Sequence, residues 1–164
     1  MKRLLAAVGM VVLLAASQSW ANIIFTFSGA TFSDGGTLTG TFTTDNTATA
    51  LVDYNILTAG GALPGFNYTP ATAISLSSLP FILVLEPGAG DPILQVTFAG
   101  GLTPLGAAIT IGQFDSFEQV GVEHREITAG SVAPAPSVPE PGTLLLLGAA
   151  MIGAGALRRR QQRT

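Results

Sequence analysis

Cysteine is absent from the 164-residue chain, and this absence removes several kinds of chemistry at once. Without thiols there are no disulfide bonds, no thiolate metal ligands and no cysteine nucleophile. An N-terminal lipoprotein anchor is excluded as well, because it requires a cysteine directly after the signal segment. A small exported domain without disulfides has to be stabilised by its hydrophobic core alone.

Positive charge is almost missing from the middle of the chain. Six of the seven Lys and Arg residues lie in the first three or the last seven positions, and Arg125 is the single one between them. Nine of the ten acidic residues lie between Asn22 and Val138, so this part carries a formal excess of eight negative charges. Such a domain repels phosphate backbones, and we therefore expect no nucleic-acid partner.

Catalytic patterns are also lacking. His124 is the only histidine, so any Ser-His-Asp triad would have to use it, yet it lies in the charged stretch Glu123–Glu126. The chain has no G-x-S-x-G elbow, no P-loop and no dinucleotide fingerprint. A pair of glycosidase carboxylates cannot be selected from nine acids without a cleft to place them. We predict no catalytic residue, a surface position for His124, and a protein that is not an enzyme.

No His or Cys cluster is present that could bind a transition metal, and calcium is the one metal that the sequence leaves open. Calcium takes several oxygen ligands, which acidic residues in Gly-rich turns can supply. No D-x-D-x-D-G loop occurs, and Asp and Asn favour turns for backbone reasons alone. We expect no cofactor; the turn residues that would supply calcium ligands are Asp34, Asp45, Asn46 and Asp91.

The first 21 residues have the pattern of a secretory signal peptide. Lys2 and Arg3 precede the apolar run Leu4–Ala16, which is shorter than the ~20 residues that span a bilayer. Ser19 and Ala21 place small residues at the two positions that a signal peptidase must accept. We predict that residues 1–21 form a signal helix that is cleaved after Ala21.

The C-terminal end combines three features in a fixed order. Pro139, Glu140 and Pro141 are followed by an uncharged run, about 143–157, and then by Arg158, Arg159 and Arg160. As a helix the run is about 22 Å long, which is marginal for a bilayer core. The arginines act as a stop-transfer signal that remains cytoplasmic, which would place residues 22–141 outside the inner membrane.

Prolines make the segment before this run stiff and extended. We assign residues 133–138 as a Pro-rich spacer and residues 139–164 as a separate tail. A polyproline-like spacer would hold the preceding domain away from the membrane and expose Glu140 at a set height above it.

The tail resembles the PEP-CTERM sorting domain in its Pro-Glu-Pro motif, short apolar helix and terminal arginine cluster. The resemblance implies processing by an exosortase, a membrane-embedded transpeptidase-like cysteine protease of bacteria that make exopolysaccharide. It covers about the last 27 residues. The segment ATFSDGGTLTGTFTTD, residues 30–45, is similar to the start of many PEP-CTERM passenger domains, which implies a shared β-sandwich type without a known activity.

Residues 22–132 read as one all-β domain. Leu38, Gly40 and Phe42 alternate with threonines, and Ala50 to Ile56 repeat the two-residue period. Residues 58–80 are rich in Gly, Pro, Ala and Ser and predict loops with at most short strands. Further strands are expected at 22–28, 81–86, 93–98, 107–113 and 117–127. We predict a small antiparallel β-sandwich, jelly-roll or Ig-like, flanked by the N-terminal signal helix and the C-terminal hydrophobic helix.

These features predict an exported structural or interaction protein of the cell surface or exopolysaccharide matrix, sorted through its tail. The alternative is a carbohydrate-binding or adhesive module held by a single-pass C-terminal membrane anchor. The Thr-rich face of residues 37–43 could bind carbohydrate or ice, although threonine is common in strands for its propensity alone. The expected partners are signal peptidase, exosortase, the inner membrane before processing, and extracellular polysaccharide.

The mature protein is predicted to begin at Asn22. N-terminal sequencing of the exported form is expected to read Asn-Ile-Ile-Phe. A mature chain that still begins at Met1 would contradict the signal-peptide assignment.

Overall fold

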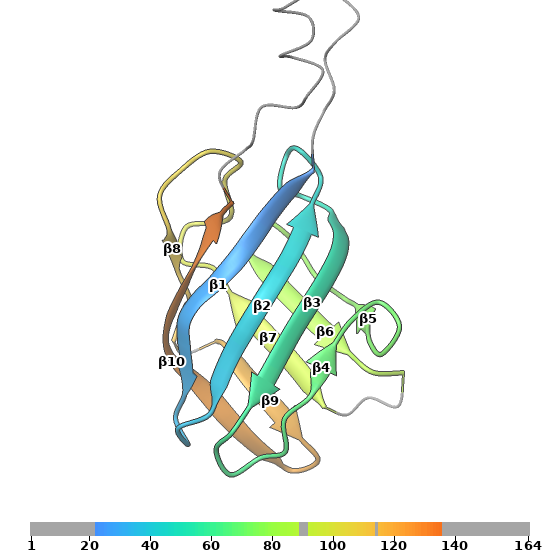
Figure 1. Ribbon diagram of the computed structural model, residues 1–164, viewed down its shortest axis with the longest axis vertical. Coiled ribbons are helices and arrows are strands. Elements are labelled where there is room, and N and C mark those ends of the chain that lie inside the picture. Colours follow the sequence, from blue (N-terminus) through green and yellow to red (C-terminus); the bar gives the residue numbers. More distant parts are fainter. Residues whose placement is uncertain (1–21, 89–91, 114, 136–164) are drawn as a thin grey trace, which may run out of the picture. The chain divides into compact units, whose positions relative to one another are not determined.

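The computed structural model describes residues 22–88, 92–113 and 115–135, and these residues form ten strands and no helix. The strands follow one another along the chain between short turns (Figure 1). They are β1 (Ile23–Phe32), β2 (Thr37–Thr44), β3 (Leu51–Ala59), β4 (Asn67–Tyr68), β5 (Ile74–Ser75), β6 (Ile82–Glu86), β7 (Ile93–Thr97), β8 (Ile109–Thr110), β9 (Phe117–Val120) and β10 (Glu123–Pro134).

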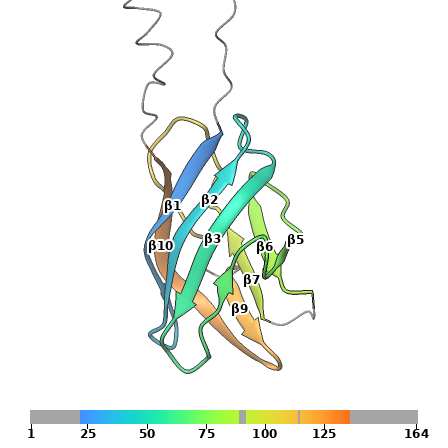
Figure 2. The ribbon, with the colours of Figure 1, turned by 45° about the vertical axis from the view of Figure 1, so that its right-hand side comes forward.

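One antiparallel sheet contains all ten strands, in the order β4-β3-β2-β1-β10-β9-β7-β6-β5, with β8 paired to β10 off this path. Most neighbours in the sheet are therefore also neighbours in the chain, and the first and last strands pair with each other. The sheet curls, so that β1, β2 and β3 lie in front of β6, β7 and β9 (Figures 1 and 2). The two ends of the sheet, β4 and β5, are not paired with each other.

Strand β10 joins the two layers of the curled sheet. Its first four residues, Glu123 to Glu126, pair with β9, and its later residues from Ile127 to Pro134 pair with β1. Figure 1 shows this strand running from beside β9 to beside β1. Register shifts in the β1–β10 and β1–β2 ladders interrupt the pairing near Gly29, which has a φ of 60°. Such bulges increase local twist and bend a strand, which the curl of the sheet requires.

The prediction of an all-β antiparallel domain is confirmed. The jelly-roll or Ig-like subtype is not: these folds contain Greek-key connections, whereas the described strands follow a meander closed by the β1–β10 pair. The two predicted flanking helices lie outside the described residues. Strand β10 continues to Pro134, past the expected end of the domain at residue 132.

The hydrophobic core lies between the layers and is centred on phenylalanine. Phe42 of β2 is fully buried, and its ring lies 5.2 Å from that of Phe25 and 5.6 Å from that of Phe27 in the neighbouring strand. Across the layers, the ring of Phe98, directly after β7, lies 5.8 Å from Phe42. Aliphatic side chains from β3, β6, β7 and β10 complete the cluster, including Ile56, Leu83, Leu85, Leu94, Val96, Ile127 and Val132.

The predicted alternation holds in β2 and fails at the start of β3. Leu38 and Phe42 are buried, and the threonines between them face outward. In β3, Tyr54 and Ile56 are buried as expected, but Val52 is 53% exposed. The ladder between β2 and β3 skips Val52, since Thr43 pairs with Asp53 and Thr44 with Leu51. This bulge shifts the alternation by one residue, which the period-two reading did not allow for.

The segment predicted as one strand at 117–127 is a hairpin. A turn at Gly121 and Val122 separates β9 from β10, and Gly121 has a φ of 63°, which glycine adopts without strain. Glu118 therefore pairs with Arg125 across the hairpin rather than lying seven residues away along one strand.

Replacing Phe42 by Ala is expected to reduce the free energy of unfolding by ~3–5 kcal/mol, because it leaves a cavity between the layers. Leu57→Ala is the matched control: Leu57 is 45% exposed on β3, and its truncation is expected to cost less than ~1 kcal/mol. Urea denaturation of both variants measures the difference. Equal losses would show that Phe42 does not join the layers as described.

Candidate functional site

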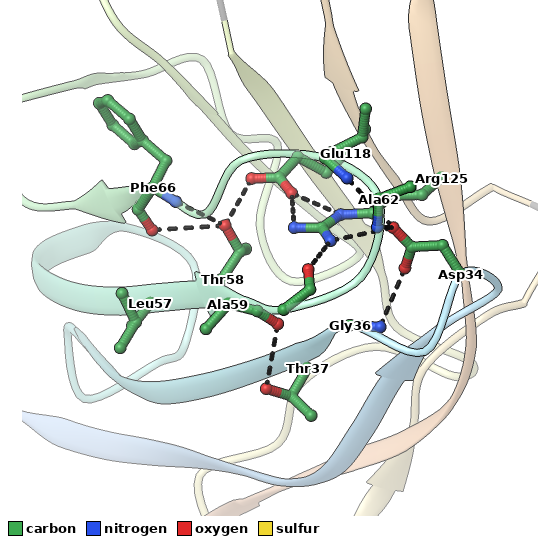
Figure 3. A network of polar contacts seen from close by, with 12 residues as sticks. Asp34, Gly36, Thr37, Leu57, Thr58, Ala59, Ala62, Phe66, Glu118 and Arg125 are labelled. Carbon is green, nitrogen blue, oxygen red and sulfur yellow. Dashed lines mark hydrogen bonds and ion pairs between the residues drawn. The ribbon is translucent and has the colours of Figure 1, made fainter.

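A buried ion pair lies on the inner face of the β9–β10 hairpin (Figure 3). Arg125 donates from Nε and Nη2 to Glu118 Oε2, at 2.8 and 2.6 Å. Arg125 is 2% exposed and Glu118 is 0% exposed. A buried charge is tolerated only if it is paired and its other polar atoms are hydrogen-bonded. The remaining polar atoms of both side chains therefore need partners of their own.

The second carboxylate oxygen of Glu118 reaches the opposite layer. Its Oε1 accepts hydrogen bonds from Thr58 Oγ1 of β3 at 2.7 Å and from the Tyr68 hydroxyl of β4 at 2.8 Å. Thr58 Oγ1 in turn accepts from the N–H of Phe66 at 3.0 Å. One carboxylate thus joins β9 to the β3–β4 end of the sheet.

Asp34 and the loop after β3 complete the surroundings of Arg125. Its Nη1 donates to Gly60 O at 2.6 Å and to Asp34 Oδ2 at 3.2 Å. Its guanidinium also lies 4.2 Å over the ring of Phe32. All three guanidinium nitrogens are therefore engaged, and no buried side-chain N or O atom of the described chain lacks a partner.

The pKa of Asp34 is lowered from 3.8 to about 2. Burial alone would raise it, but hydrogen bonds from the N–H groups of Gly36 and Ala62, together with the charge of Arg125, outweigh burial. The N–H distances are 2.9 and 2.8 Å. The carboxylate therefore stays ionised and ties the Asp34 turn to the loop at Ala62.

Two glycines make this close approach feasible. A Cβ on Gly36 would lie 2.4 Å from Arg125 Nη1, and one on Gly61 would lie 2.3 Å from Asp34 Oδ2. Gly61 also has a φ of 77°, a left-handed conformation that favours glycine. The Asp34-Gly35-Gly36 turn, whose Asp34 the sequence offered as a calcium ligand, is thus part of the charge network around Arg125.

The network connects the β9–β10 hairpin to the loops after β1 and β3, and its Arg125 and Glu118 side chains are buried. Sequence reasoning noted Arg125 as the single central cation but did not pair it, because the β9–β10 turn was not recognised. The usable signal was present: one arginine in an acidic β domain, with an acid seven residues before it and a Gly between them.

The calcium hypothesis gains no support from the described residues. Asp34 is paired with Arg125, and Asp45 accepts hydrogen bonds from the Thr47 hydroxyl and from the N–H groups of Thr49 and Ala50. These bonds lower the pKa of Asp45 to about 2. Over the part of the chain that the structure describes, no group of three or more His, Cys, Asp or Glu side chains could hold a metal, and Asp91 lies outside that part. The absence of a cofactor stays a prediction.

His124 is exposed on the outer face of the hairpin, opposite Gln119. The surface position predicted for it is therefore confirmed. That the protein is not an enzyme stays a prediction.

The threonines of β2 lie on an outer face that extends over neighbouring strands. Thr41 lies opposite Thr26 of β1 and Asn55 of β3. The hydroxyls of Thr37 and Thr39 donate to backbone carbonyls of β3, each at 3.4 Å. The polar face is therefore broader than one strand, but it also contains exposed Asp53, Ile24 and Leu57. Part of its hydrogen-bonding capacity is used internally.

The residues predicted to direct export and sorting lie outside the described residues. They are Ser19 and Ala21, Pro139, Glu140 and Pro141, the run 143–157, and Arg158, Arg159 and Arg160. A search of the described segments for a helix of sufficient length and hydropathy to cross a membrane found none.

The family model described as the PEP-CTERM protein-sorting motif matches residues 137–160, so this chain carries that motif. The match supports exosortase-dependent sorting of an exported, cell-surface protein. Neither the curated proteins nor the solved structures contain a match to the chain.

Asp34→Asn is expected to lower the free energy of unfolding by about 1–2 kcal/mol at pH 7, since a depressed carboxyl pKa stabilises the folded state above the unfolded pKa. This contribution is complete above pH 3.8 and is lost as the pH falls through about 2. The urea midpoints of variant and wild type should therefore converge on acidification.

Glu123→Gln is the control for this prediction, because Glu123 is exposed and lies outside the network. A constant difference between Asp34→Asn and wild type from pH 7 to pH 2 would contradict the assigned role of the Asp34 charge.

Proposed function

We propose that this protein is a structural or interaction component of the cell surface or exopolysaccharide matrix. In this proposal signal peptidase releases Asn22, the apolar run 143–157 holds the chain in the inner membrane, and an exosortase acts at Pro139-Glu140-Pro141. Residues 22 to about 135 are the part delivered. The observation that carries the proposal is the match of the sorting motif to residues 137–160.

Two properties of the β domain support a non-enzymatic role. Its two buried charged side chains, Glu118 and Arg125, are paired with each other, and its one histidine has no acidic partner in the described residues. No metal cluster is present over the described ranges 22–88, 92–113 and 115–135. We propose that the domain acts by contact and carries no cofactor.

The alternative is a carbohydrate-binding or adhesive module that a single-pass C-terminal helix keeps in the membrane. One observation favours the binding part of this alternative: the domain exposes a threonine-rich sheet face that spans β1, β2 and β3. The two readings differ in whether the tail is removed, and that can be measured directly.

Intact mass spectrometry of the exported protein tests the sorting proposal. We expect a chain that begins at Asn22 and lacks the residues beyond the neighbourhood of Pro141. Changing Pro139, Glu140 and Pro141 together to Ala is expected to abolish processing and leave a larger, membrane-bound form.

Pro134→Ala, outside the motif, is the matched control and should be processed like the wild type. A wild-type protein that retains Arg158 to Thr164, unchanged by the triple substitution, would show that the tail is a permanent anchor.

A further inference from the structure

The outer face of the β9–β10 hairpin carries a shallow hollow lined by Phe117, Gln119, His124 and Glu126. Phe117 lies opposite Glu126, and Gln119 lies opposite His124. Because successive residues of a strand point to opposite faces, these four side chains form a two-by-two block on the reverse of Glu118 and Arg125. The buried ion pair thus fixes the hairpin whose outer face forms the hollow.

The hollow leaves hydrogen-bonding groups unused. His124 and Glu126 are exposed, and their side chains make no hydrogen bond or ion pair to the described residues. Glu126 bonds through its backbone: its N–H donates to Ser33 Oγ at 3.3 Å, and its carbonyl oxygen accepts from the N–H of Ser33 at 2.8 Å. Gln119 donates from Nε2 to Gly121 O at 2.9 Å, which orients its amide, and its carbonyl oxygen accepts from none of the described residues. By contrast, the side chains of Gln95, Thr97 and Gln113 donate to backbone carbonyls.

Charge restricts the ligand that this hollow can take. Arg125 is the only Lys or Arg in residues 22–135, and it is buried and paired with two carboxylates. Glu126 lines the hollow, and Glu123 is exposed in the same strand. A phosphate, sulfate or uronate would meet negative charge here with no cation to pair with.

We propose that this hollow is a binding subsite for one neutral sugar residue of a polysaccharide. The ring of Phe117, half-buried in the sheet, packs against the C–H face of a pyranose ring. Gln119, His124 and Glu126 surround that ring and exchange hydrogen bonds with its hydroxyl groups. Cross-strand neighbours ~5 Å apart and same-strand neighbours ~7 Å apart enclose an area of the size of one such ring.

The inference rests on the proposed function in one respect: a domain delivered to the cell surface or matrix meets polysaccharide there. It goes further by assigning the ligand class and the residues. A single shallow subsite binds weakly, and a long polysaccharide compensates by presenting many equivalent sugars.

Affinity electrophoresis of the exported protein tests the proposal, in gels that contain a neutral glucan, galactan or mannan, or an anionic alginate. At least one neutral polysaccharide is expected to retard the protein. Phe117→Leu, which keeps apolar volume without the ring, and Gln119→Ala are each expected to raise its dissociation constant by about fivefold or more. His124→Ala, at an exposed position, provides a third variant that does not disturb the core.

Thr39→Ala, on the outer face of the other layer, is the matched control and should bind like the wild type. Retardation by none of the neutral polysaccharides, or only by alginate, would overturn the proposal. So would a loss of binding in Thr39→Ala with none in the hollow variants, which would place the site on the threonine face. Processing is read separately from intact mass, so normal processing without binding rejects the subsite and leaves the proposed sorting function standing.

Discussion

Arg125 is the one cation of a negatively charged domain, and its side chain is where the two layers of the sheet are held together. Its three nitrogens bind Glu118 of β9, Asp34 after β1 and Gly60 after β3. Glu118 extends these contacts to Thr58 and Tyr68. Removing one member of such a buried pair leaves an uncompensated charge, at a typical cost of ~3–5 kcal/mol. β4 and β5 do not pair, so the network is a polar connection between the β9–β10 hairpin and the β3–β4 end of the sheet that the strand pairing does not supply.

The network also helps to explain how a chain without cysteine can hold a curled sheet of short strands. A phenylalanine cluster around Phe42 supplies non-directional burial, which is compatible with many registers of similar hydrophobicity. The contact of two Arg125 nitrogens with one oxygen of Glu118 is compatible with one register of the β9–β10 hairpin. We infer that burial stabilises the domain and that the ion pair specifies its arrangement, a role known for buried polar groups in other systems.

The strands could be predicted where the chain alternates regularly and is bounded by clear turn residues. The threonines of β2 and the Asp34-Gly35-Gly36 turn are of this kind. Prediction failed where one residue breaks the alternation, as Val52 does, or where a turn contains an apolar residue, as Val122 does between β9 and β10. The Arg125–Glu118 pair depends on that turn, and its contacts with Asp34 and Thr58 depend on the curl of the whole sheet. Neither the ion pair nor these contacts can be read from a short stretch of sequence. The sorting tail could be found from sequence alone, because an enzyme reads it as a linear motif rather than as a folded surface.

The pairing of the first strand with the last has a consequence for the order in which the chain can fold. Phe25 lies opposite Pro134, and Phe32 opposite Ile127, so the central ladder joins residues from the two extremes of the domain. In an exported chain that is threaded N-terminus first, β1 must wait for nearly the entire domain to emerge before it gains this partner. Contacts so distant in sequence form slowly. The ladder can close only when Pro134 is available, a few residues before the sorting motif at 137–160. Chain connectivity therefore makes completion of the fold one of the last events before the sorting motif follows.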